Sequence, residues 1–226
     1  MTLPDLGPLW LTLKLAALVT GLLLVLGTPL AWWLAQSRSR LAPVVEALTA
    51  LPLVLPPTVL GFYLLLAFNP NAPIGAFWLQ ITGSTLTFSF AGLVIASIIY
   101  SLPFTVHPLQ AAFLSLGRAP LEAAASLNAG PLDAFFSVAL PLSARGYLVA
   151  AVLTFAHTLG EFGVVLMVGG NIPGETRVIS IDIYEHVERI EYGAAHVLSG
   201  LLLALSFTIL LCLYTLNARL RRGQQG

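Results

Sequence analysis

The chain has 226 residues, of which 58% are hydrophobic and only 9% are charged, and its formal net charge is zero. Soluble domains carry about 25% charged residues, so this composition, with a mean hydropathy of +0.90, excludes an ordinary soluble domain and indicates an integral membrane protein. The balanced charge provides no basic surface for nucleic acid. The single cysteine, Cys212, excludes an internal disulfide.

Five apolar runs are long enough to cross a bilayer, which takes about 20 mostly apolar residues in a helix. We therefore expect an all-α integral membrane protein with about five transmembrane helices in one domain, residues 9–216, followed by a tail at 217–226. In chain order, the predicted spans are Leu9–Ala35, Val44–Phe68, Leu86–Val106, Gly146–Val168 and His196–Leu216.

The positive charges between these runs predict which way the chain crosses the membrane. Lys14 is left out of the count, because it is close enough to the start of the first run to reach the surface. Cytoplasmic loops carry the excess of Lys and Arg. Seven arginines fall on one side and two on the other, which predicts an N-terminus outside and a cytoplasmic C-terminus. The seven are Arg38, Arg40, Arg118, Arg145, Arg219, Arg221 and Arg222, and the two are Arg177 and Arg189.

The second run contains three prolines, Pro52, Pro56 and Pro57. Because each proline removes a backbone donor, we expect the helix to break at Pro56 and Pro57. A break at membrane depth is tolerated where it faces protein or a water-filled path. Two interpretations remain open: a packing kink, or a stretch at Pro56, Pro57 and Thr58 that lines a translocation path.

The fourth run carries His157 and Glu161, four residues apart and therefore on one helical face. Counted along a helix from Arg145, Glu161 lies roughly 24 Å deep, in the outer half of the membrane. A buried charge of this kind is costly and is usually paired or functional. Since a bare carboxylate repels anions, we favour a structural pair of Glu161 with His157 or a neighbouring subunit over a gate.

Residues 107–145, on the predicted cytoplasmic side, read as two short helices separated by a turn. Pro120 suits a helix start, and Leu121–Leu127 is rich in helix formers. Asn128 tolerates the left-handed conformation that ends a helix. Leu132–Leu140 is predicted to form the second helix, which Pro141 ends.

The order of residues in this loop resembles the EAA loop of ABC-importer permeases, which docks on a separate ATPase. The pattern is Glu-Ala-Ala, then Gly-Ala after a short gap, then an apolar stretch that ends in Leu-Pro. This sequence departs from it where Asn128 replaces the usual Gly. The resemblance implies ATPase coupling through Glu122, Ala123, Ala124, Asn128, Ala129, Gly130, Leu140 and Pro141.

Two further stretches, LPLVLPPTVLGFYLLL at Leu51–Leu66 and LGEFGVVLMVGGNIPGETR at Leu159–Arg177, resemble the molybdate branch of these permeases. Permeases for sulfate and tungstate are near relatives. The resemblance implies a type I ABC-importer permease fold in the cell membrane. It also implies a homodimer that works with two ATPase subunits and an extracytoplasmic oxyanion-binding protein.

The chain is not expected to be an enzyme. No GxxxxGK[ST] phosphate-binding loop is present, and the only lysine is Lys14. ATP is therefore expected to bind the partner subunit, with no metal or other cofactor in this chain. Two alternative functions from other classes are a secondary anion transporter and an intramembrane enzyme. Glu161 is the only candidate proton site for a secondary transporter, and an intramembrane enzyme would lack a nucleophile.

The outer segment Gly169–Ala195 is acidic, and its apolar residues recur at helical spacing. They are Ile183, Val187 and Ile190. A short amphipathic helix is predicted here, either as a solvated surface helix or as a docking surface for the binding protein.

Overall fold

The computed structural model describes residues 5–222, with side chains as far as Thr215, and the described residues form helices and connecting turns without a strand. The helices are α1 (Gly7–Gln36), α2 (Ala42–Val54), α3 (Pro57–Phe68), α4 (Pro73–Thr82), α5 (Phe90–Leu116), α6 (Ala119–Ser126), α7 (Pro131–Ala134), the π-helical turn η1 (Phe135–Ala139), α8 (Leu140–Leu142), α9 (Ala144–Leu159), α10 (Gly163–Gly169), α11 (Ile179–Glu188) and α12 (Tyr192–Arg222).

Three helices, α1, α5 and α12, are each long and apolar enough to cross a membrane. Two pairs of shorter helices pass the same test only when each pair is counted as one bent span. The pair α2–α3 bends by 113°, and the pair formed by residues 131–142 and α9 bends by 71°. The described residues thus provide three spans, or up to five.

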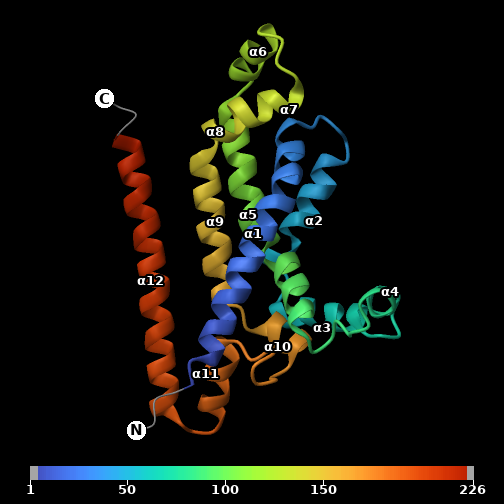
Figure 1. Cartoon of the computed structure of the whole chain (residues 1–226), viewed down its shortest axis with the longest axis vertical. Helices are drawn as coiled ribbons and strands as arrows, with labels where there is room; N and C mark the ends of the chain where they lie inside the picture. The colour runs from blue at the N-terminus through green and yellow to red at the C-terminus, as the bar shows by residue number, and fades with distance from the viewer. Residues whose placement is uncertain (1–4, 223–226) are drawn as a thin grey trace.

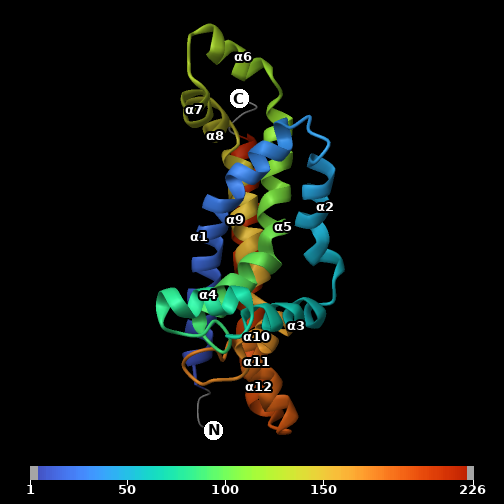
Figure 2. The ribbon, with the colours of Figure 1, turned by 90° about the vertical axis from the view of Figure 1, so that its right-hand side faces the viewer.

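The centre of the molecule is a bundle in which α1, α5 and α9 stand side by side, while α12 stands at the edge (Figures 1 and 2). Leu15, Val19 and Leu23 of α1 pack against Leu93 and neighbouring residues. A second cluster joins the other ends of α1, α5 and α9. In contrast, α12 is only 11% buried along its apolar stretch, as expected for a helix that faces lipid.

The two ends of the molecule differ in charge. At one end lie α6, α7 and α8, the α1–α2 connection, the start of α9 and the end of α12 (Figure 1). We call it the Arg-rich end, because Arg38, Arg40, Arg118 and Arg145 belong to these segments. The start of α1 and helices α10 and α11 lie at the opposite end (Figure 1). The start of α1 and the loop between α5 and α9 therefore lie at opposite ends of the described residues.

The break in the predicted second span occurs where the prolines placed it, but it is much more than a kink. Helix α2 ends at Val54 and α3 begins at Pro57, after which α3 and α4 project from one side of the bundle (Figure 1). Helix α2 alone has 13 residues and is about 20 Å long, too short for a hydrocarbon core of about 30 Å. The predicted break is therefore confirmed, and α2 and α3 count together as at most one bent span.

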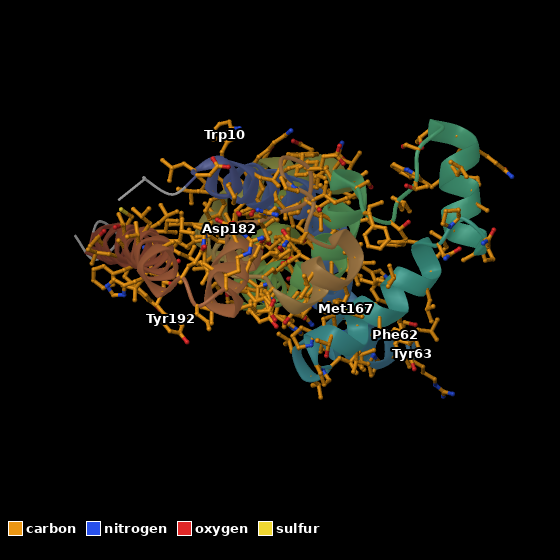
Figure 3. All side chains as sticks on the ribbon, turned by 90° about the horizontal axis from the view of Figure 1, so that it is seen from below. Trp10, Phe62, Tyr63, Met167, Asp182 and Tyr192 are labelled. Carbon is orange, nitrogen blue, oxygen red and sulfur yellow. The ribbon has the colours of Figure 1, made fainter. Side chains whose placement is uncertain are left out.

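Helix α3 is held against α10 through two glycines. A Cβ atom on Gly61 would lie 2.8 Å from Cβ of Met167, and one on Gly163 would lie 2.8 Å from Cβ of Pro57. Such distances leave no room for a side chain. Seen from the α10–α11 end, Met167 lies where α10 meets α3, whereas Phe62 and Tyr63 point away from the bundle (Figure 3).

Two predicted boundaries differ from those in the structure. Helix α5 runs ten residues past Val106, to Leu116, so the loop between spans begins at Gly117 instead of residue 107, and His107 lies inside the helix. Membrane helices tolerate the prolines in this stretch, Pro103 and Pro108, and Gln110 donates a hydrogen bond to Glu46 across 3.1 Å.

The helix predicted to end at Pro141 continues to Leu142, because Pro141 lies in the first turn of α8, where its missing N–H is harmless.

The predicted fourth span, Gly146–Val168, is divided. Helix α9 ends at Leu159 and α10 begins at Gly163, so Glu161 lies in the break between them and not on a continuous helix. The predicted outer helix exists as α11, but it ends at Glu188, and Ile190 follows it with a left-handed φ of 62°.

Candidate functional site

The coupling segment, Arg118–Leu142, forms the tip of the Arg-rich end (Figure 1). Helix α6 begins with Pro120 in its first turn and carries Glu122 there too, where a carboxylate is favoured by the helix dipole. The end of α6 is closed by two backbone bonds, from Asn128 N–H to the Ala125 carbonyl at 2.9 Å and from Ala129 N–H to the Ala124 carbonyl at 3.1 Å. This is the Schellman arrangement.

Asn128 is the residue that makes this ending possible. Its φ is +65°, in the left-handed region, where Asn is better tolerated than other residues with a side chain. The predicted conformation at this position is therefore confirmed, and the replacement of Gly leaves the turn geometry intact.

The predicted coupling residues are mostly accessible. Ala124 faces inwards and is 8% exposed, Ala129 and Leu140 are half-buried, and Glu122, Ala123, Asn128, Gly130 and Pro141 are exposed. Leu127 is 85% exposed and Leu132 is 75% exposed, because both lie beyond the bundle. Below α6 a cavity of about 470 Å³ separates it from the ends of α1 and α5. A small helix with exposed apolar residues at a molecule's tip is suited to a protein partner.

An aromatic cluster connects the coupling segment to the bundle. The Phe135 ring lies edge-on to Trp32 of α1 with centroids 5.1 Å apart, and Trp32 lies edge-on to Phe113 of α5 at 5.0 Å. Phe113 in turn contacts Tyr147 of α9 at 6.1 Å. The packed rings therefore connect η1 to all three central helices.

The predicted path residues meet at one place near the opposite end. A cavity of about 540 Å³, which we call the path cavity, is lined by the start of α3, by α5 and by the α9–α10 break. Its lining residues are Pro57, Thr58, Tyr100, His157, Gly160, Glu161, Phe162 and Gly163. Four of the five residues predicted from sequence are among them; Pro56 is not.

Glu161 faces away from solvent, with 1% of its side chain exposed. Its Oε2 accepts a hydrogen bond from Ser97 at 2.5 Å and its Oε1 accepts one from Ser101 at 2.7 Å. Nδ1 of His157 lies 3.6 Å from Oε1. The backbone carbonyl of Glu161 accepts a bond from Ser180 of α11. The predicted proximity to His157 is confirmed, but the main partners are hydroxyl groups of α5.

These hydroxyl groups continue between α5 and α9 and form what we call the hydroxyl seam. Ser101 also lies 2.9 Å from Thr158, and Thr105 lies 2.6 Å from Thr154. All are buried. They were not predicted from the sequence, although a signal exists: Ser97, Ser101 and Thr105 recur every fourth residue, as do Thr154 and Thr158, so each set occupies one helical face.

At the α10–α11 end, a polar network holds the loop 170–178 against α11. The Asn171 side-chain amide donates to Glu185 at 2.7 Å, and the Arg177 guanidinium bonds Asn171 at 2.6 Å and pairs with Glu185 at 3.2 Å. The Asn171 bond, followed by the nearby cations, lowers the pKa of Glu185. Burial raises the pKa of Asp182, against the opposing effects of His186 and Arg177. Asp182 lies among the helices in Figure 3.

The stretch NIPGETR, Asn171–Arg177, therefore holds the loop and its neighbouring helices together. Thr176 fastens its own loop, because its hydroxyl donates to the Gly169 carbonyl at 2.7 Å and accepts from Ile172 N–H at 3.1 Å. Ile179 N–H at the start of α11 donates to Thr12 of α1 at 2.8 Å. The loop, α11 and α1 are therefore held together beside the path cavity.

Known proteins with similar sequences are transport permeases. The chain is 57% identical over 219 residues to the molybdenum transport system permease protein ModB of Azotobacter vinelandii, covering 97% of this chain and 96% of that one. It is 35% identical to the protein of that name from Escherichia coli K12, with 86% of each chain covered. It is also 33% identical to the sulfate transport system permease protein CysT of Salmonella typhimurium, over 89% of this chain and 73% of that one.

The fold has solved counterparts. A chain of the inward-facing MetNI methionine ABC transporter matches with a TM-score of 0.71, 20% identity and 92% coverage of both chains. A chain of a bacterial alginate ABC transporter, in complex with its alginate-loaded periplasmic protein, matches at 0.70 with 20% identity, covering 94% of this chain and 79% of that one. The family model described as "binding-protein-dependent transport system inner membrane component" matches residues 27–222. The chain therefore belongs to the family of inner-membrane components of binding-protein-dependent transport systems.

Proposed function

We propose that this chain is the permease subunit of an ATP-driven importer that carries molybdate across the cytoplasmic membrane by alternating access. The main observation in support of this proposal is the 57% identity to a molybdenum transport permease over 97% of the chain. The separation of an exposed coupling segment at one end from the cavity that holds His157 and Glu161 towards the other supports the mechanism, because it gives the two ends different tasks.

In this proposal the Arg-rich end faces the cytoplasm, as the excess of arginine favours. Two copies of the chain form a homodimer, and each coupling segment receives one ATPase subunit, which binds the ATP. An oxyanion-binding protein docks at the α10–α11 end. The alginate transporter offers a parallel, since its structure holds a ligand-bound periplasmic protein in complex with the transporter.

The mechanism follows from the packing. Closure of the ATPase dimer on ATP moves α6, and the aromatic cluster around Trp32 and Phe135 passes this movement to α1, α5 and α9. The hydroxyl seam between α5 and α9 slides or separates, which changes access to the path cavity. Coupling of this kind is reciprocal, so a loaded binding protein stimulates ATP hydrolysis.

Sulfate is the second candidate cargo, because a sulfate permease is 33% identical over 89% of this chain. Tungstate has the same charge and shape as molybdate and is expected to follow it. The rival of another class, a secondary transporter, would use Glu161 as its proton site.

The test is uptake of labelled molybdate into proteoliposomes that hold this permease with or without its ATPase, with the loaded binding protein on the side of the membrane opposite the ATPase. We expect uptake only with the ATPase, ATP and the binding protein together. Uptake by the permease alone would contradict the proposal and favour the secondary transporter. Sulfate uptake in place of molybdate would contradict the cargo assignment.

A further inference from the structure

His157 occupies an unusual position in the wall of the path cavity. Its ring is stacked on Phe104 with centroids 3.9 Å apart and lies 4.7 Å from the Tyr100 ring, so α5 holds it on two sides. Its side chain is 18% exposed and lines the cavity. The fixed ring can therefore present only one edge to whatever enters.

The hydrogen bonds indicate which edge this is. The single proton of the Ser101 hydroxyl is donated to Glu161, so the Ser101 oxygen has only acceptor capacity left. Nδ1 of His157 lies 2.9 Å from that oxygen and must carry the hydrogen between them. Because Nδ1 is directed at α5, Nε2 is the nitrogen left for the cavity. A second N–H at Nε2 exists only when the ring is positively charged.

The surroundings provide partners for a charged ring. The carboxylate of Glu161 is 3.6 Å from Nδ1 and is itself buried, with both oxygens occupied by serine hydroxyls. The faces of Phe104 and Tyr100 are electron-rich and attract a cation. The Glu161 carboxylate is tied to α5 on the Nδ1 side of the ring, and Nε2 is the ring nitrogen that does not contact it.

We propose that the charged imidazole of His157 is the contact for the oxyanion in the path cavity, through Nε2–H, and that Glu161 is a positioning residue that holds the ring. This proposal rests on the proposed import of an oxyanion. Glu161 partly offsets the attraction, so the anion is held weakly and can leave, as conduction requires. The hydroxyls of Thr58 and Tyr100, in the same cavity, are available as neutral donors.

The test compares substitutions in the assembled transporter, with uptake measured per assembled complex as a function of loaded binding protein. His157→Phe keeps the ring stack and removes both nitrogens, and we expect its maximal uptake to fall at least tenfold. His157→Arg restores a charged donor and is expected to recover most of the uptake. His196→Phe is the matched control, because His196 is exposed on α12 outside the cavity, and it should behave as wild type.

Glu161→Gln should also reduce uptake, but adding it to His157→Phe should cause no further loss, because its effect acts through the ring. Wild-type uptake by His157→Phe, an inactive His157→Arg, or additive losses in the double variant would each overturn the proposal. If His157→Phe fails to assemble, His157→Gln, a neutral donor, must fall below His157→Arg. A wild-type complex that takes up no molybdate would instead count against the proposed function.

Discussion

Asn128 takes a backbone conformation that costs most residues with a Cβ about 1–2 kcal/mol. For Asn the cost is smaller, since its short polar side chain bonds locally. Its position at the end of α6 determines where the helix stops and where the chain turns towards Gly130. This one residue therefore fixes the shape of the tip that we propose meets the ATPase.

Substitution at Asn128 tests this role. Asn128→Gly should leave the turn unchanged, whereas Asn128→Val should destabilise the end of α6 by about 1–2 kcal/mol. Amide hydrogen exchange at Leu127, Asn128 and Ala129 should then become roughly 5–30-fold faster in the Val variant. Equal exchange in the Gly and Val variants would show that φ at this position is unimportant.

At this scale the sequence predicted residues that stand out chemically. His157, Glu161 and Pro57 were found because an ionisable residue or a proline in an apolar run is unusual, and Thr58 because it follows the two prolines. The fold brings all four to one cavity. Ser97 and Ser101 were missed, because serine is unremarkable in a membrane helix. Their importance depends on Glu161, 64 and 60 residues away in the chain, and such a pairing is visible only in the fold.

Among the elements, α3 and α10 form a joint without space for side chains. Gly61→Ala would place a methyl group 2.8 Å from Cβ of Met167, closer than such atoms approach. Overpacking of this kind costs typically about 1–3 kcal/mol. We expect a lower Tm for the purified permease and a changed path cavity, since α3 contributes Pro57 and Thr58 to its wall.

Gly21→Ala is the matched control, because the added Cβ on α1 has nothing within 4 Å. It should leave Tm unchanged or raise it slightly, since Ala is the better helix former. A fall in Tm of the same size in both variants would mean that helix packing at Gly61 is not the cause.

The stability of helix α11 should depend on pH through two carboxylates, whose pKa values are shifted in opposite directions. The pKa of Glu185 is lowered in the fold by the Asn171 bond and the nearby cations, so its contribution to stability is present above the ordinary pKa of 4.5 and is lost as pH falls through the folded value. At neutral pH, Glu185→Gln should cost about 1 kcal/mol, or about 2–4 °C in Tm. The difference should vanish in acid.

Asp182 provides the contrast. Its pKa is raised by burial, so its favourable contribution is present below the ordinary value of 3.8 and is lost as pH rises through the folded value. Asp182→Asn should therefore keep or raise the Tm at neutral pH. Thermal unfolding of both variants between about pH 3 and 7 distinguishes the two effects, and a Tm loss at neutral pH for Asp182→Asn would contradict this assignment.

Element boundaries were less predictable than element positions. Hydropathy ended the third span at Val106, where polar residues and Pro108 begin, but tertiary packing extends α5 to Leu116. Nothing in the composition of residues 146–168 reveals that α9 stops at Leu159. The turn at Asn128 and the break at Pro56 and Pro57 were predicted, because both depend on local backbone chemistry.

The whole molecule is a multi-pass protein of the cytoplasmic membrane, with an exposed tip at one end and the cavity that holds His157 and Glu161 towards the other. The link between them consists of the aromatic cluster at the base of the tip and the hydroxyl seam of α5 and α9. Both are packed contacts between helices, and both involve α5 and α9. We propose that the partner ATPase, when it binds and hydrolyses ATP, moves α6 and thereby changes the packing around the cavity.

The most direct test is Ala123→Trp in the reconstituted transporter. Ala123 is exposed on α6, so a bulky residue there should block docking without disturbing the bundle, unlike the inward-facing Ala124. Ala17→Trp, at an exposed position on α1, is the control. With Tm unchanged, the account predicts that Ala123→Trp loses both molybdate uptake and the stimulation of ATP hydrolysis by loaded binding protein, while the control keeps both. Wild-type uptake and stimulation in Ala123→Trp would contradict it.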